Sequence, residues 1–582
     1  MKRTVFIFIV GLVLMACTDQ LEQYPQDKIS PQTYFRNEND LRLYTNSFYN
    51  ILPGAVGIFS EKVDNIVSNT LADELTGQRT VPTSGGGWDW GTLRNINFYL
   101  ENSVKCDDEN VRARYDGVAR FFRAYYYFNM VKRFGDVPWY DKVISDKDTE
   151  ALQKKRDTRT LVIDNMIKDL DFAIEHLPAD RTVDQVSKWT ALALKSRICL
   201  YEGTFRKYHT ELAVSGWESM LDLAIEASEQ LMKGSGYALY NTGNPGKDYL
   251  NLFASIDPIE TEVILARLYS DALQIYHYVN YYLTSPGQGR NGLEKRLVNS
   301  YLMLDGNRFT DIPGYEKMTF VDEVKNRDPR LSQTIRTPGY TRIGETTRLV
   351  PDFSLCMTGY QIIKYLTSPK YDQYDRSCNA MPLMRYAEIL LNYAEAKAER
   401  GTITQEDLDK SINLIRSRAG MPGLNLVNAN ADPDSYIAKL YPAVCGENKG
   451  VILEIRRERR IELVMESFRW DDVMRWKEAS ACFLEPFKGM YFPATGSYDL
   501  DDDGKFDICI YKDEKPNAGD IQYYKLGVDI ILESGESGNV MVNPHIQKIW
   551  DEDKDYFYPI PIQERLLNPN LTQNPGWDDG ID

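Results

Sequence analysis

Paired helical patterns recur along this chain, and their repetition limits the possible folds more than any other sequence feature. In each pattern, apolar residues return at helical spacing until a glycine or proline ends the segment. The patterned segments are residues 111–140, 160–177, 187–201, a stretch from Trp217, 383–399 and 406–419. The first helix should stop at Gly135, and the segment at 160–177 should pair with that at 187–201, which should end at Gly203. Their unit of roughly forty residues or less is close to the about 34 residues of tetratricopeptide-like hairpins. Hairpins of this kind stack into one elongated body.

The segments between these patterns are irregular. Residues 53–92 are rich in glycine and include Trp88 and Trp90, whereas residues 240–380 and 485–545 show few helical signals. Glycine and proline in such numbers favour loops over regular structure, and long loops in compact proteins are often binding loops. We therefore expect a mainly α protein in which helical hairpins alternate with loops, short strands and short helices.

The N-terminus is typical of a secreted lipoprotein. Lys2 and Arg3 precede an apolar run, residues 5–16, which is shorter than the about 20 residues that a membrane-spanning helix needs. The run ends in LMAC at residues 14–17, a pattern typical of a bacterial lipobox. We expect residues 1–16 to be a signal peptide, Cys17 to be lipidated, and residues 17–30 to be a polar tether.

The overall charge argues against nucleic acid as a partner. With 68 basic and 85 acidic side chains, the chain carries a formal net charge of −17, which repels a phosphate backbone. Eight cysteines are present, but no two have the CxxC spacing of a zinc ribbon or a redox motif. The high tyrosine and tryptophan content, 38 and 9 residues, suits wet surfaces that bind flat, amphipathic ligands.

Several segments resemble the SusD/RagB family closely. In the first half, they are FRAYYYF at 122–128, RFGDVP at 133–138 and KWTALAL at 188–194. In the second half, they are RYAEILLNYAEA at 385–396, RERRIEL at 457–463, FRWDD at 468–472, YPIP at 558–561 and NPNLTQNPGW at 568–577. Together with the lipobox, these segments cover the mature chain from end to end.

The resemblance implies a fold and a role. The fold has about four tetratricopeptide-like hairpins packed against an irregular ligand-binding half. A helical region at 31–235 would precede a C-terminal region at 236–582. The role is that of a lipid-anchored outer-membrane protein, facing the cell exterior, that captures oligosaccharides for a SusC-like, TonB-dependent β-barrel transporter. Peptide binding, as in RagB-type uptake subunits, is the alternative ligand class.

The sequence offers no constellation for catalysis. A glycoside hydrolase needs two carboxylates about 5 to 9.5 Å apart across a cleft. The adjacent Asp471 and Asp472 point apart on a helix, and no motif pairs the other carboxylates. The four histidines, at 176, 209, 277 and 545, lack metal-site spacing, and no GxSxG elbow occurs. A non-catalytic binding protein is the prediction, and an enzyme is the less favoured alternative.

Two groups of aromatic and charged residues lie outside the helical patterns and are the candidate ligand site. The first group is Asp73, Arg79, Trp88 and Trp90, and the second is Tyr276, Tyr278, Tyr281 and Tyr282. Glycines at 85–87 should let the backbone present Trp88 to solvent, whereas Trp90 could equally be core because a helical run follows it. Tyr281 and Tyr282 are adjacent, so at most one of them should contact a ligand.

Two further motifs have competing interpretations. Residues 287–292 fit GxGxxG, but Pro286 precedes them and no strand–helix alternation surrounds them, so a dinucleotide site is not expected. Asp499, Asp501 and Asp503 fit the spacing that wraps calcium, with Asp507 at position nine. Ile510 stands where a bidentate glutamate is expected. No cofactor is required, and a structural calcium ion or a solvated acidic turn both remain open.

Overall fold

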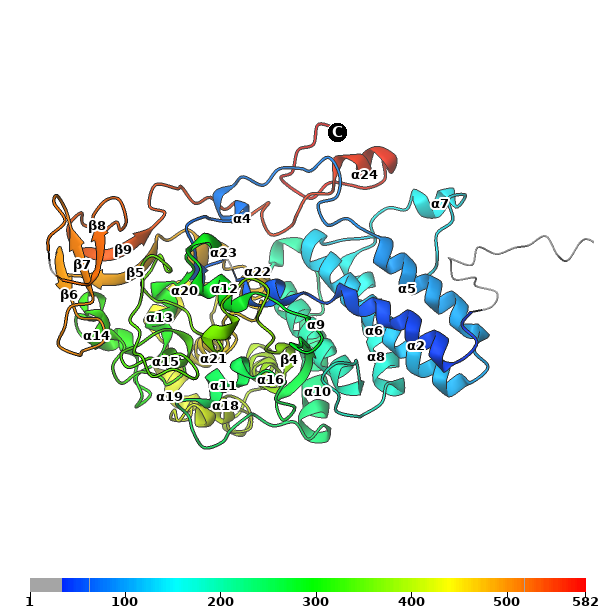
Figure 1. Ribbon diagram of the computed structural model, residues 1–582. Helices are drawn as coiled ribbons and strands as arrows, with labels where there is room; N and C mark the ends of the chain where they lie inside the picture. Colours follow the sequence, from blue (N-terminus) through cyan, green and yellow to red (C-terminus); the bar gives the residue numbers. More distant parts are fainter. Residues whose placement is uncertain (1–33, 62, 518, 582) are drawn as a thin grey trace, which may run out of the picture.

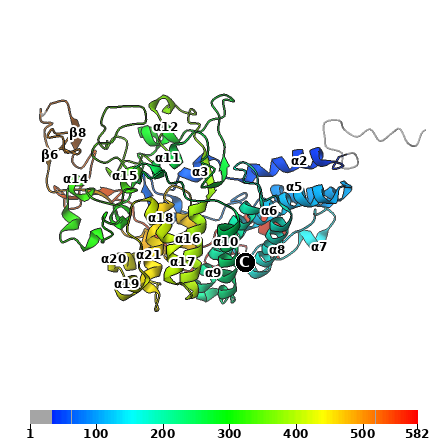
Figure 2. The same cartoon turned by 90° about the horizontal axis from the view of Figure 1, so that it is seen from below.

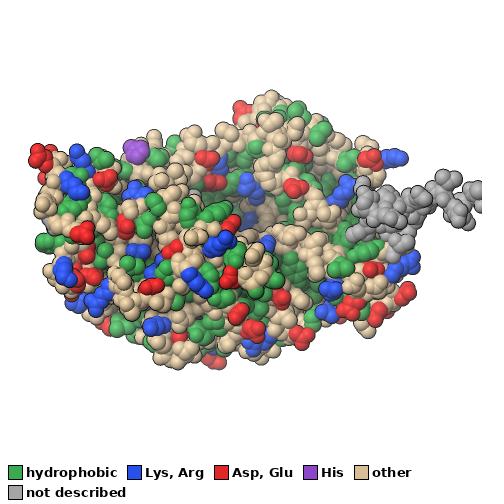
Figure 3. All heavy atoms as spheres, in the orientation of Figure 1, with side chains coloured by type: hydrophobic (Ala, Val, Ile, Leu, Met, Phe, Trp, Pro, Cys, Tyr) green, Lys and Arg blue, Asp and Glu red, His purple; other side chains and the backbone are tan. Residues whose placement is uncertain are grey.

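The computed structural model describes residues 34–61, 63–517 and 519–581, which form a mainly helical protein with a few short strands (Figure 1). The expected signal peptide at 1–16, the lipid acceptor Cys17 and the tether at 17–30 lie outside these residues. Within the described ranges, no helix is both long enough and apolar enough to cross a membrane. The surface in Figure 3 mixes acidic and basic side chains without a large patch of one sign.

Long helices form one end of the molecule. They are α2 (Glu38–Asn46), α5 (Gly91–Asn102), α6 (Glu109–Phe134), α8 (Arg159–His176), α9 (Lys188–Tyr208) and α10 (Trp217–Gly234). The longest, α6, begins where the Asp108 carboxylate accepts from the backbone N–H groups of Asn110 and Val111, at 3.0 and 3.1 Å. It ends at Gly135, whose φ of +73° a residue with a side chain rarely adopts.

The expected hairpin of residues 160–177 and 187–201 is present, because α8 packs on α9. Each of the two helices, however, packs more extensively on its other neighbour, α8 on α6 and α9 on α10. The second expected helix was to end near Gly203, yet α9 continues to Tyr208. Gly203 is the point of close approach, because a Cβ there would lie 2.7 Å from the Leu221 Cδ2 atom. This glycine therefore serves helix packing rather than helix termination.

A second helical array continues the first (Figure 2). It consists of α16 (Tyr386–Arg400), α17 (Gln405–Asp409), α18 (Ile412–Arg418), α21 (Lys449–Glu462) and α22 (Arg469–Trp476), and α16 packs on α10. The expected helix at 383–399 begins later, because Met381–Arg385 forms strand β4 beside β2 (Val263–Arg267). The expected helix at 406–419 is interrupted at Ser411.

The charged helix α21 is buried from Gly450 to Glu462. Within the helix, Arg457 forms an ion pair with Glu454 at 2.6 Å. Most partners, however, come from other segments: Glu462, for example, accepts from Arg385 and Arg418 at 2.7 and 2.6 Å. The helix is thus a scaffold that joins several segments through buried, paired charges.

The remaining elements are short. The helices are α3 (Ala55–Phe59), α4 (Asp73–Thr76), α7 (Thr149–Leu152), α11 (Asp248–Ala254), α12 (Val279–Thr284), α13 (Lys295–Ser300), α14 (Phe320–Glu323), α15 (Leu331–Thr334), α19 (Leu426–Ala431), α20 (Ser435–Leu440), α23 (Ala479–Phe483) and α24 (Ile562–Leu567). The sheets are small: β1 (Ile66–Val67) pairs with β3 (Gly292–Leu293), and β5 (Phe487–Phe492) with β9 (Gly538–Val542). A three-stranded sheet joins β6 (Gly496–Tyr498), β7 (Ile508–Tyr511) and β8 (Gln522–Lys525) at the end opposite α2 (Figure 1).

Candidate functional site

Three consecutive glycines place the two candidate tryptophans. Gly85, Gly86 and Gly87 all have positive φ angles, and the Trp88 N–H donates to the Gly85 carbonyl at 2.9 Å, which closes a tight turn. The Arg133 side chain donates to the Gly86 carbonyl at 2.8 Å, and a Cβ at Gly87 would lie 2.8 Å from its Nε. The turn is therefore held against the C-terminal end of α6.

Trp88 is buried, with 6% of its surface exposed. Its ring packs edge-to-face on Phe134 at 4.9 Å and on Trp90 at 5.3 Å. The expectation that the glycines present Trp88 to solvent is wrong, because burial of the indole at the end of α6 outweighs the freedom of the loop. Trp90 is half-buried and also packs on Tyr140 at 5.5 Å.

Both tryptophans border a cavity of about 560 Å³. Its walls come from α5, the segment after α6, α7 and α24, and include Arg94, Tyr140 and Leu567. The Gln153 amide donates to the Leu567 carbonyl at 2.8 Å, which fixes α24 over α7. Volume and lining suit a small organic ligand. A ligand role for the two tryptophans thus remains a prediction, and it can involve only the parts of their rings that line this cavity.

Arg79 is largely buried among residues of the C-terminal segment. It forms an ion pair with Asp555 at 2.7 Å, and its side chain is only 7% exposed. Its guanidinium also lies over the rings of Tyr558 and Trp577, at 4.8 and 5.4 Å. These neighbours tie the glycine-rich segment to the C-terminal segment, and a ligand contact for Arg79 stays a prediction. Asp73 is exposed at the start of α4, and its ligand role stays a prediction.

Tyrosines of the second group form an aromatic surface with a residue that the sequence did not suggest. Tyr278 stacks on Tyr374 with ring centroids 5.2 Å apart, and Tyr281 meets the same ring edge-on at 5.6 Å. Tyr374 is 59% exposed, so its ring remains open to solvent. We call Tyr278, Tyr281 and Tyr374 the tyrosine triad.

The other two tyrosines are engaged elsewhere. Tyr282 is buried, and its hydroxyl donates to the Asn291 side chain at 3.1 Å, which leaves Tyr281 as the member of that pair able to contact a ligand. The hydroxyl of Tyr276 donates to the Asp271 carboxylate at 2.6 Å, and this bond raises the pKa of Tyr276. A ligand contact for Tyr276 stays a prediction, whereas Tyr282 is internal.

The loop that carries Tyr374 is anchored on α12. Asp372 accepts from the Arg342 guanidinium at 2.6 and 3.0 Å, and from the side chain of Asn280 at 3.0 Å. These contacts hold Tyr374 in place beside Tyr278. Only one faint signal in the sequence could have indicated Tyr374: it is a second aromatic residue after Tyr371, in an otherwise polar stretch without helical or strand periodicity.

The loop at 287–292 is structural. Its Gly289 carbonyl accepts from the Asn69 N–H at 2.8 Å, and Gly292 belongs to the two-residue strand β3, antiparallel to β1. A Cβ at Gly292 would lie 2.3 Å from the Thr358 hydroxyl oxygen, so a glycine is required there. This loop does not open a helix that follows a parallel strand, the setting that dinucleotide binding needs.

Three of the four candidate calcium ligands converge. Carboxylate oxygens of Asp499, Asp501 and Asp507 lie within 4.8 Å of one another, and burial raises the pKa of both Asp501 and Asp507. Asp503 is not part of the group. Its carboxylate accepts from the backbone N–H and the ammonium of Lys505, at 2.9 and 3.2 Å, and these bonds lower its pKa. Calcium binding stays a prediction, with three ligands instead of four.

Comparison with known proteins shows which family this chain matches. The model of the SusD family matches residues 261–577, and a model described as "Starch-binding associating with outer membrane" matches residues 91–200. Among curated relatives, SusD-like protein P2 of Formosa agariphila is 25% identical, covering 84% of this chain and 94% of the relative. SusD-like protein P38 of the same organism is 24% identical, covering 81% and 91%.

Solved structures share the fold. A SusD-like carbohydrate binding protein from Bacteroides fragilis aligns with a TM-score of 0.69 at 22% identity, covering 93% of this chain and all of the other. A second SusD-like protein from that organism gives a TM-score of 0.68 at 22% identity, covering 95% and 100%. Since the SusD family model spans more than half of the sequence, the chain belongs to the SusD/RagB family.

Proposed function

We propose that this protein captures oligosaccharides outside the cell and delivers them to a SusC-like, TonB-dependent transporter in the outer membrane. It makes and breaks no bond in doing so. Family membership supports a binding role, and the Bacteroides fragilis relative of the same fold is named a carbohydrate binding protein. The name of the second family model supports attachment at the outer membrane, for which Cys17 would supply the lipid.

The tyrosine triad is the observation that carries the ligand class. A sugar ring has apolar C–H faces, and these faces pack on aromatic rings, while its hydroxyls need polar partners. Tyr374 exposes most of its surface, and Tyr278 and Tyr281 brace the ring from two directions. Because the three rings are held by packing, a saccharide would meet a preformed surface and would order few side chains on binding.

Polar groups near the triad can form hydrogen bonds with the hydroxyl groups of a saccharide. Arg376 is exposed, and its guanidinium lies 5.2 Å from the centre of the Tyr276 ring, whose hydroxyl bonds to Asp271. Guanidinium and carboxylate groups form strong hydrogen bonds with hydroxyls. An aromatic platform flanked by such groups suits a glycan better than a peptide, which would rely on pairing with an open strand edge.

Isothermal titration calorimetry on protein lacking residues 1–17 tests this proposal. The titrants are maltoheptaose, xylohexaose and laminarihexaose, with a mixture of tryptic peptides for the alternative ligand class. Tyr374→Ala should weaken saccharide binding by about 5- to 150-fold, since a stacked ring contributes about 1–3 kcal/mol. Phe506→Ala is the matched control, because Phe506 is 57% exposed but belongs to the segment between β6 and β7.

The outcomes separate the alternatives. Saccharide binding that Tyr374→Ala weakens and Phe506→Ala leaves unchanged supports the proposal. Binding of the peptides alone would replace it with the peptide-uptake alternative. Release of new reducing ends during the titration would show a glycoside hydrolase and contradict the non-catalytic role.

A further inference from the structure

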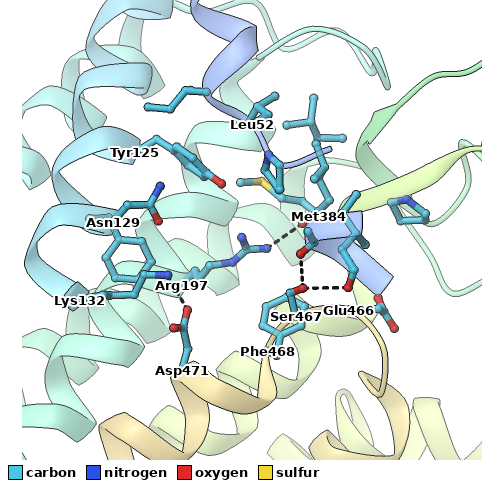
Figure 4. Close-up of a pocket in the computed structure, with 18 residues that line it drawn as sticks. Leu52, Tyr125, Asn129, Lys132, Arg197, Met384, Glu466, Ser467, Phe468 and Asp471 are labelled. Carbon is cyan, nitrogen blue, oxygen red and sulfur yellow. Dashed lines mark hydrogen bonds and ion pairs between the residues drawn. The ribbon is translucent and has the colours of Figure 1, made fainter. Parts of the chain in front are cut away.

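A second cavity, of about 290 Å³, lies where α6 and α9 of the helical end face the segment between α21 and α22 (Figure 4). Strand β4 and residues 51–58 close its other side. Neither group of sequence candidates borders it. We call this cavity the α6–α22 cleft. Its charged side chains are Lys132, Arg197, Glu466 and Asp471, and Tyr125, Asn129, Ser467 and Phe468 also line it.

One face of α6 supplies three of these side chains. Tyr125, Asn129 and Lys132 follow one another at intervals of four and three residues, so they lie along one side of the helix. Figure 4 shows all three projecting toward the cleft. Asn129 is exposed, whereas Tyr125 and Lys132 are half-buried, so the cleft is open at the Asn129 side.

An ion pair forms part of the wall. The Lys132 ammonium donates to Asp471 Oδ2 at 2.6 Å, and the two side chains are 21% and 26% exposed. Among the described residues, Lys132 is the sole hydrogen-bonding partner of Asp471. The pair therefore presents ammonium protons and a free carboxylate oxygen, Oδ1, next to each other. A donor and an acceptor side by side match two neighbouring hydroxyl groups of a sugar.

Arg197 presents a further donor. Its Nε and Nη2 atoms donate to the two carboxylate oxygens of Glu388 at 2.6 and 2.7 Å, and Nη2 also donates to the Leu383 carbonyl at 2.9 Å. Within the described part of the chain, the third nitrogen, Nη1, has no acceptor. The guanidinium also lies 4.9 Å from the centre of the Phe468 ring. Arg197 is thus held rigidly with one NH₂ group unused.

The charges of the cleft are balanced. Lys132 is neutralised by Asp471, Arg197 by the buried Glu388, and Glu466 by Lys364 and Arg385. An anionic ligand would meet the Asp471 carboxylate, and a cationic one would meet two cations, so a neutral ligand rich in hydroxyls fits best. The volume is at the small end for ligand pockets, about 300–1,000 Å³, which suits one sugar ring rather than a chain.

We infer that the α6–α22 cleft binds one pyranose unit of a neutral saccharide, as a second site separate from the tyrosine triad. The inference takes its ligand class from the proposed function, but it rests on residues of α6, α9 and α22. The rings of Tyr125 and Phe468 would contact the C–H face of the sugar. Asn129, Arg197 and the Lys132–Asp471 pair would bind its hydroxyls.

Saturation-transfer difference NMR with the methyl glycosides of glucose, galactose, mannose and xylose tests this site. We expect at least one glycoside to give a signal with the wild-type protein lacking residues 1–17. Asp471→Asn keeps the shape but removes the strong acceptor, and should weaken that binding by about tenfold. Asn129→Ala changes an exposed side chain, so it should reduce binding without affecting folding. Asn110→Ala, an exposed change on the same helix, is the matched control.

The results also distinguish this inference from the proposed function. Retention of the signal in Tyr374→Ala and Asn110→Ala, with its loss in Asp471→Asn and Asn129→Ala, supports a separate site. The inference fails if both cleft variants bind like wild type, or if Tyr374→Ala removes the signal. It also fails if none of the four glycosides binds while the oligosaccharides do. A lack of any saccharide binding in calorimetry would instead overturn the proposed function itself.

Discussion

The Arg385 guanidinium donates to the carboxylate of Glu462 at 2.7 Å, with both side chains fully buried. Arg385 ends strand β4, and Glu462 ends helix α21, so the bond joins two segments that are distant in sequence. Arg418 and Arg330 donate to the same carboxylate at 2.6 and 3.2 Å. Burial alone would raise the pKa of Glu462, but the three guanidinium groups outweigh it and lower that pKa.

Removing the charge of Glu462 should destabilise the protein strongly. Glu462→Gln removes the anion that Arg385, Arg418 and Arg330 share, although each keeps another carboxylate partner. Removing one partner of a buried ion pair typically costs about 3–5 kcal/mol in the free energy of unfolding. Urea denaturation measures the loss, and Glu447→Gln is the control because Glu447 is exposed. Equal midpoints for the two variants would show that the buried network does not depend on this carboxylate.

Glu478 should make stability depend on pH near neutrality. Burial raises the pKa of Glu478 to about 7, against the opposing effect of Arg456, whereas its ordinary value is 4.5. The folded state therefore holds a proton that the unfolded state releases, and this group weakens folding as pH rises from about 4.5 to 7. Glu478→Gln should gain stability relative to wild type as pH rises from 5 to 8, by about 3 kcal/mol at most. A difference between the two proteins that stays constant across this range would contradict the shift.

Trp88→Ala should damage the fold. Trp88 is only 6% exposed and packs on Phe134 and Trp90, and loss of a buried tryptophan typically costs about 3–5 kcal/mol. The urea midpoint should fall well below that of Phe506→Ala, which removes an exposed aromatic ring. A Trp88→Ala protein of wild-type stability and reduced saccharide affinity would restore the original expectation of a ligand-stacking ring.

Calcium should stabilise the protein through three aspartates. If Asp499, Asp501 and Asp507 hold the ion, a chelator should lower the melting temperature of the wild-type protein. Asp501→Ala should abolish that effect, whereas Asp503→Ala should retain it, because Asp503 is occupied by Lys505. Identical melting with and without chelator would favour the solvated acidic turn.

Cys17 should carry the lipid anchor. Cys17→Ala should leave the protein without palmitate label and move it out of the membrane fraction. Cys445→Ala is the control, since Cys445 is an exposed cysteine in the folded part of the chain. Label that persists in Cys17→Ala and disappears in Cys445→Ala would place the lipid elsewhere.

The sequence was sufficient for the family and for much of the helical architecture. Residues 385–396 and 457–463 resemble the family in uninterrupted runs, and the matching family model covers both. Gly135 ends α6 as expected, because a positive φ angle is a local property of one residue. Gly203 does not end α9, since its role depends on Leu221 of the neighbouring helix. In the sequence, Gly135 and Gly203 look alike, because each follows a run of residues with helical periodicity.

The sequence by itself determined the properties that depend on a few neighbouring residues. These properties are helical periodicity, turns and recognisable motifs. Tertiary structure alone decided which aromatic rings are exposed and which charges are paired. Trp88 is buried because Phe134 lies beneath it, and Tyr374 is exposed because Asp372 and Arg342 hold its loop beside α12. Burial and ion pairing are properties of surfaces that meet from distant parts of the chain, so local composition around Trp88 or Tyr374 could not reveal them.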